Sequence, residues 1–264
     1  MPVEVAAVLS RYQGQIAKAG TLLKVGVTNA NEVRALVAVL NAHAAQSLAG
    51  AELAAVQAAN NQRVVEADNR VEQIRPHLAE LLTVSMWSAF DAAVMDLCLH
   101  IIKSEWSKSA AVARITMTVG DFMGLDDDAK ARVFLNELLT SSRARGAPGV
   151  ARYEKVLDLL EVSGPVTTKA RKWILRWAET RHVIVHRAGA IDDKFVKAVP
   201  WAKCTVGDVV AIGPEEFVSF GKASTVYLVE LCRRLVEKDL AVSVATEEQI
   251  RQQRDALDKD LAEP

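Results

Sequence analysis

The chain has 264 residues, half of them hydrophobic and a quarter charged, and its formal net charge is −1. This length and composition suit a soluble globular protein with one large domain or two smaller ones. A net charge so close to zero argues against a protein that binds nucleic acid over its whole surface.

Neither secretion nor membrane insertion is expected. The first residues lack the basic start and apolar core of a signal peptide, and no apolar run of about 18 residues is free of charge. Cys98, Cys204 and Cys232 lie far apart in the sequence, so their spacing predicts neither a disulfide framework nor a zinc site. We therefore expect a cytoplasmic protein.

Residues 1–76 predict an alanine-rich N-terminal helical region. Apolar residues recur at helical spacing over 3–19, 31–45 and 51–74, whereas the segment 20–29 and Gly50 predict breaks. Alanine favours a helix but buries little surface, so this region needs a partner, either the main domain or another chain. Pro76 predicts a kink or a new helix start.

Residues 77–240 predict a helical domain, so the expected fold class is all-α. Its helices are predicted at 77–102, 128–142, 150–162, 168–187 and 214–238. Two short β-branched segments, 194–199 and 206–212, predict a small β-hairpin inserted into the bundle. Residues 241–264 are charged and predict a peripheral helix or a frayed tail.

Two charged residues lie within apolar helix faces. At about 100° per residue, Arg181 falls near the middle of a face that also carries Trp177 and Val185. Asp91 lies on the apolar face of the helix at 77–102. Burying an unpaired charge is costly, so Arg181 needs a buried partner, a cavity or a second subunit. We expect a direct contact between Asp91 and Arg181.

His186 is the best candidate for acid–base chemistry. Imidazole titrates near neutrality, so one group can both accept and donate a proton. From 143 to 187 there are ten Lys and Arg residues against four acidic ones, which predicts either a solvated basic face or a surface for phosphate backbones. His186 can also be an ordinary histidine at a helix end, where its positive charge favours the helix dipole.

The pattern of Arg181, a polar residue, three further residues and His186 resembles the motif of HEPN-domain ribonucleases. The motif ends a long amphipathic helix, and the continuation IVHRAGAID is similar to that of bacterial HEPN proteins. The helix SMWSAFDAAVMDLCLHII at 85–102 resembles their first core helix. The resemblance covers roughly residues 80–238 and implies a HEPN-like helical bundle.

The resemblance implies a metal-independent endoribonuclease, with Arg181, His182 and His186 as catalytic residues. Arg187, Arg176 and Lys172 are the candidates for RNA contacts, Asp91 supports Arg181, and neither a cofactor nor a metal is expected. The family implies a homodimer through the motif helix, an antitoxin or activator protein as a further partner, and a role as a toxin or phage-defence effector.

Two alternatives remain open. Many HEPN domains bind RNA or nucleotides, or only dimerise, without cleaving RNA. A helical scaffold whose alanine-rich N-terminal region is the functional surface is the second alternative. Neither alternative needs His186 to exchange a proton, so an RNA cleavage assay distinguishes both from the enzyme.

Overall fold

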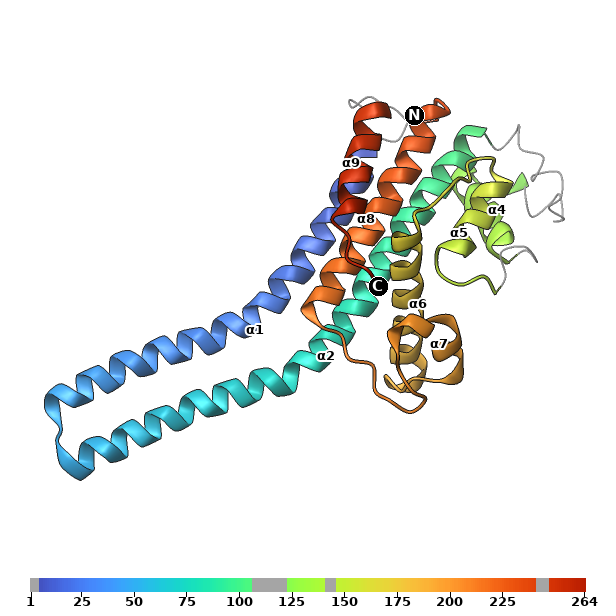
Figure 1. Ribbon diagram of the computed structural model, residues 1–264. Helices are drawn as coiled ribbons and strands as arrows, with labels where there is room; N and C mark the ends of the chain where they lie inside the picture. The colour runs from blue at the N-terminus through green and yellow to red at the C-terminus, as the bar shows by residue number, and fades with distance from the viewer. Residues whose placement is uncertain (1–4, 106–122, 141–145, 241–246) are drawn as a thin grey trace. The chain divides into compact units, whose positions relative to one another are not determined.

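The computed structural model describes residues 5–105, 123–140, 146–240 and 247–264, and within these ranges it is helical without a β-strand (Figure 1). The predicted all-α class is therefore confirmed. The chain forms two compact units. One is Gln15–Leu82, called the hairpin unit below. The other, called the bundle unit, is formed by Met1–Gly14 together with Thr83–Pro264.

The hairpin unit consists of two antiparallel helical segments that belong to α1, Val5–Ser47, and α2, Gly50–Glu105. Arg34 Nη2 contacts Asp68 Oδ1 at 2.7 Å, and Asn60 donates to Asn41 at 2.9 Å. The predicted turn at Gly50 is confirmed. The predicted break at 20–29 is wrong, because α1 runs through it: a glycine costs a helix only about 1 kcal/mol, which a long helix tolerates.

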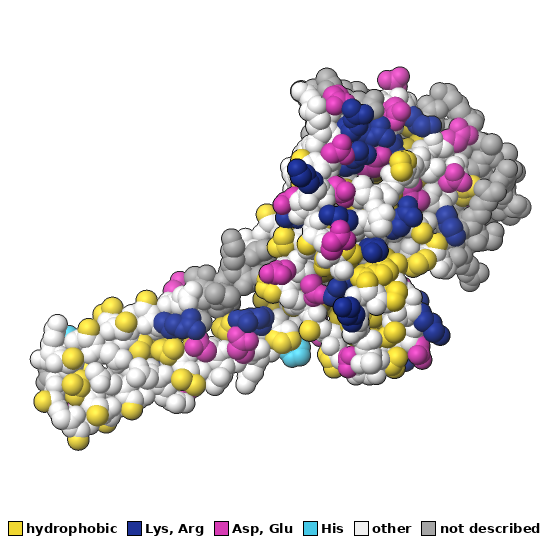
Figure 2. Space-filling model, in the orientation of Figure 1, with side chains coloured by type: hydrophobic (Ala, Val, Ile, Leu, Met, Phe, Trp, Pro, Cys, Tyr) yellow, Lys and Arg dark blue, Asp and Glu magenta, His cyan; other side chains and the backbone are white. Residues whose placement is uncertain are grey.

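Few apolar side chains are buried within the hairpin unit. Val37 and Ala44 are buried, whereas Leu36 and Val39 are 59 % and 66 % exposed. Figure 2 shows hydrophobic side chains, and no Lys, Arg, Asp or Glu, on the visible face of the end that carries the α1–α2 turn. The predicted need of this region for a partner remains a prediction.

Helix α2 continues through Pro76, so this proline does not begin a new helix. The segment Gly50–Ser104 is the one helix in the described ranges that is long and apolar enough to cross a membrane, by length and composition alone. Of its most apolar 18-residue window, 44 % is buried inside the protein. The core helix of a soluble protein passes the same test, so this feature is weak evidence for a span.

An aromatic cluster forms the core of the bundle unit. Phe90 of α2 is fully buried at its centre. Its ring centroid lies 5.7–6.3 Å from those of Tyr12, Trp87, Tyr153, Phe220 and Tyr227. These rings come from α1, α2, α5 (Val150–Leu159) and α8 (Pro214–Glu237), so one cluster joins four helices. Tilted and edge-to-face arrangements of this kind add to the free energy of burial.

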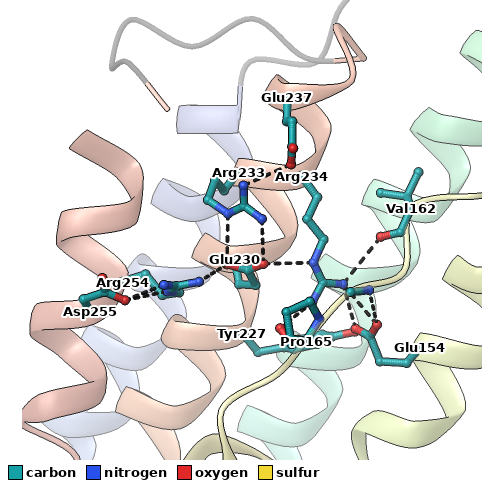
Figure 3. Close-up of polar contacts among 11 residues, drawn as sticks. Glu154, Val162, Pro165, Tyr227, Glu230, Arg233, Arg234, Glu237, Arg254 and Asp255 are labelled. Atoms are coloured by element: carbon teal, nitrogen blue, oxygen red, sulfur yellow. Dashed lines mark hydrogen bonds and ion pairs between the residues drawn. The ribbon is translucent and has the colours of Figure 1, made fainter. Parts of the chain in front are cut away.

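A buried ionic network connects α5, α8 and α9 (Figure 3). Arg234 donates to both carboxylate oxygens of Glu154 and to Glu230, each at 3.0 Å, and to the backbone oxygen of Pro165. Glu230 also accepts from Arg254 of α9, Glu247–Lys259, at 2.6 Å. The network thus ties the loop before the motif helix to α5 and α8. Residues 241–264, for which a peripheral helix or a frayed tail is predicted, contain the helix α9.

The predicted β-hairpin is wrong. Residues 194–199 lie largely in α7, Asp193–Ala198, and 206–212 form only an isolated bridge from Val209 to Ala190. Asp192 begins α7 because its side chain accepts from the backbone N–H of Phe195 at 2.9 Å. Phe195 and Val199, one helical turn apart, then pack on Val183. Helix capping and burial therefore override the β propensity of this segment.

Candidate functional site

The predicted motif lies at the end of α6, Thr168–Arg187, close to the predicted range. Thr167 caps the helix by accepting from the backbone N–H of Ala170. Two tryptophans anchor it to the bundle. The Trp177 ring stacks on Phe220 with centroids 4.0 Å apart, and Trp173 Nε1 donates to Ala262 at 2.8 Å. The helix ends in a left-handed residue, Ala188, with φ 50°.

Different sides of α6 are buried in its first half and near the motif. Its first half buries Trp173 and Trp177 as predicted. Near the motif, however, Glu179 and Val183 are buried, whereas Val185, predicted on the apolar face, is 45 % exposed. The physical reason is α7, which packs against Val183 and covers the opposite side of the helix end. The motif is therefore more exposed than its apolar pattern predicts.

Arg181 has no partner among the described residues. Its Nε atom is buried without a hydrogen-bond partner, although the residue as a whole is half-buried. The expected contact with Asp91 is wrong: within the described ranges no ion pair joins them, and Asp91 accepts from the Tyr153 hydroxyl at 2.5 Å. Burial, with the charge of Asp91, raises the pKa of Tyr153 well above its usual range, so this phenol stays a donor.

His182 and His186 are brought together. They lie one helical turn apart, with ring centroids 4.8 Å apart, and His186 is exposed whereas His182 is half-buried. Burial lowers the pKa of His182, and the nearby charge of Lys194 lowers it further, against the opposing effect of Glu179. His182 is therefore held in its neutral form at lower pH than a free histidine.

Two residues beside the histidines were missed in the sequence. Glu179 is buried one turn before His182. Its Oε2 atom lies 3.0 Å from Lys194 Nζ and forms an ion pair, without the geometry of a hydrogen bond. The spacing of Glu179 and His182 on one helix is visible in the sequence. The position of Lys194 is not, because it depends on how α7 folds back.

Arg187, one of the three predicted RNA contacts, lies 3.8 Å from Asp192 and is exposed.

The other two predicted RNA contacts have intramolecular partners. Arg176 forms an ion pair with Glu216, and its guanidinium lies 5.3 Å from the Trp173 ring centroid. Lys172 Nζ lies 5.3 Å from the Trp201 ring centroid. These contacts reduce the freedom of both side chains to bind phosphate. No contact within the described residues joins Arg176 or Lys172 to His182 or His186.

A pocket of about 380 Å³ lies beside α6, separate from the histidines. Arg176 and Glu216 line it, together with Trp173, Trp177 and Thr180. Neither Arg181 nor the two histidines contribute to its wall. Among the residues that the structure describes, no group of three or more His, Cys, Asp or Glu side chains is placed to hold a metal ion.

Comparison with known proteins finds no matching family model, no matching curated protein and no matching solved structure.

Proposed function

We propose that this protein is a metal-independent endoribonuclease of the HEPN type, with its site at the exposed end of α6. One observation carries the proposal: two histidine rings lie 4.8 Å apart beside an arginine that no described residue holds. A guanidinium that no described residue binds is available for a phosphate, for which its planar donors are well suited. The motif resemblance adds the reaction type.

The proposed reaction needs proton transfer and charge stabilisation at one phosphodiester. The 2′-hydroxyl of RNA loses its proton to an imidazole and attacks the adjacent phosphorus. The 5′-oxygen leaves and takes a proton, which gives a 2′,3′-cyclic phosphate and a 5′-hydroxyl. His186 is the proposed acid–base group, with His182 beside it as a second imidazole. Arg181 stabilises the charge of the pentacovalent phosphorane.

A homodimer through α6 is part of the proposal. Val185 is 45 % exposed and Ile184 is half-buried, so the motif end of α6 presents apolar surface next to a guanidinium that no described residue binds. A second copy of α6 would cover this surface and bring two sets of Arg181 and His186 into one cleft. The role as a toxin or phage-defence effector, with an antitoxin or activator, rests on the family resemblance alone.

The test is cleavage of single-stranded RNA by the purified full chain in the presence of EDTA. We expect His186→Ala to lower the rate by about 10²–10⁴-fold, the usual contribution of a general acid–base group. His77→Ala is the matched control, because His77 is another exposed helical histidine, near Glu80 in α2. Circular dichroism checks that each variant is folded.

Two results would contradict the proposal. One is an unchanged cleavage rate in folded His186→Ala protein. The other is cleavage that requires added Mg²⁺ or Mn²⁺. The chemistry of the product ends gives a further check, because a 5′-phosphate product would rule out attack by the 2′-hydroxyl.

A helical scaffold is the second candidate, favoured by the exposed apolar residues of the hairpin unit. Leu36 and Val39 are more than half exposed, and so is Ile74. In that case the chain would not cleave RNA, and the variants Leu36→Ser and Val39→Ser would abolish association with a partner. The same cleavage assay therefore separates the two candidates.

A further inference from the structure

The two histidines at the end of α6 have the spacing of a helical metal chelate. Side chains at positions i and i+4 lie one above the other on one face of a helix. Two histidines in this relation provide two of the ligands of zinc in helical metal sites. His182 and His186 hold these positions, and their ring centroids lie 4.8 Å apart.

The distance between the rings fits one shared ion. A Zn–N bond of about 2.05 Å and a ring radius of about 1.15 Å place each ring centroid about 3.2 Å from the metal. Ligand angles of 90° to 109° then separate the two centroids by about 4.5 to 5.2 Å. The observed separation of 4.8 Å lies within this interval. The centroid separation is thus the one that chelation of a single ion requires.

The charges around the pair come from three elements. From α6 come Glu179, a buried carboxylate, and Arg187; α7 contributes Lys194, and Asp192 lies in the loop between them. Arg181, next to His182 on α6, adds a positive charge that no described residue pairs. The negative groups favour a cation and the positive groups oppose it, so the metal has to be held by the two imidazoles and not by the local field. Metal ligation needs neutral imidazole.

We infer that His182 and His186 together bind one divalent transition-metal ion of the Zn²⁺ and Cu²⁺ class, with water in the remaining positions. Imidazole ligands suit Zn²⁺, Cu²⁺ and Ni²⁺, whereas Mg²⁺ prefers oxygen ligands, so the site discriminates against Mg²⁺. The ion occupies the ring nitrogens that would otherwise exchange protons.

This site implies inhibition by the metal, a consequence that rests on the proposed ribonuclease function. An imidazole whose lone pair binds Zn²⁺ cannot accept a proton from a 2′-hydroxyl. Zn²⁺ is therefore expected to stop cleavage and EDTA to restore it. Metal binding itself does not depend on catalysis, so it can be measured without RNA.

The experiment is calorimetric titration of the metal-free full chain with ZnCl₂, with MgCl₂ as the class control. We expect the parent and the His77→Ala control to bind one Zn²⁺ per chain, and His182→Ala and His186→Ala to lose this saturable binding. His77 is the matched control because its i±4 neighbours, Gln73 and Leu81, are not histidines. His186→Gln replaces His186→Ala if the latter does not fold.

Two outcomes would overturn the inference: a parent chain without saturable Zn²⁺ binding, or equal binding in folded His182→Ala and His186→Ala protein. Binding of Zn²⁺ with no RNA cleavage by the parent would support the metal site and refute the ribonuclease. Cleavage that is unaffected by Zn²⁺, with no binding in the titration, would refute the metal site alone.

Discussion

Replacing Arg234 by Met tests the buried ionic network. The Arg234 side chain is 4 % exposed and donates to Glu154, Glu230 and the backbone oxygen of Pro165. Methionine fills a similar volume but donates no hydrogen bond. The substitution therefore leaves the Glu154 carboxylate partly buried without its cation, whereas Glu230 keeps Arg254.

The expected loss of stability is about 3–5 kcal/mol, the range for removing one partner of a buried ion pair. Glu154 retains two hydrogen bonds, from the Tyr227 hydroxyl at 2.9 Å and the backbone N–H of Gly164 at 3.1 Å, which places the loss near the lower end. The control is Arg251→Met. Arg251 pairs with Glu248 on the surface, where both are more than half exposed, so its loss is about 0–1 kcal/mol.

The assay is equilibrium unfolding in urea, followed by circular dichroism, for the parent and both variants. Adding Glu154→Gln to Arg234→Met should recover part of the lost stability, because the amide no longer leaves a buried charge unpaired. If Arg234→Met lowers the unfolding free energy no more than Arg251→Met does, the reasoning is refuted. A double variant less stable than Arg234→Met would also contradict it.

Three further predictions concern the same unit. The pKa of Glu230 is lowered, because hydrogen bonds from three arginines outweigh the effect of burial. The stability that Glu230 contributes is therefore present above about pH 4.5 and is lost as the pH falls through its lower folded pKa. Acid unfolding of the Glu230→Gln variant should lack this loss of stability. Gly164→Ala should cost about 1–3 kcal/mol in urea unfolding, since a Cβ there would lie 2.8 Å from Arg234 Nε. Asp91→Asn should lower thermal stability, because the short hydrogen bond from Tyr153 loses its charged acceptor. The RNA cleavage rate of the folded variant should stay unchanged. A reduced rate would connect Asp91 to Arg181 after all.

The positions of most helices in the bundle unit follow from local signals in the sequence. Thr167 caps α6 and Pro214 opens α8, both at the predicted ends, because capping depends on atoms within three or four residues. Helical periodicity also places the charge of Arg181 on a face predicted to be apolar, and it places His182 next to His186. The candidate site could therefore be located from the sequence, although its function remains a proposal.

Only the tertiary structure decided which partner each charged residue meets. Asp91 and Arg181 both lie on apolar faces, and pairing them satisfied each pattern, but Asp91 contacts Tyr153, 62 positions away in the sequence. Lys194 reaches Glu179 because Phe195 is buried and folds α7 back against α6. Periodicity gives the direction of a side chain from its own helix. Its neighbour depends on packing between elements distant in sequence, which no local pattern encodes.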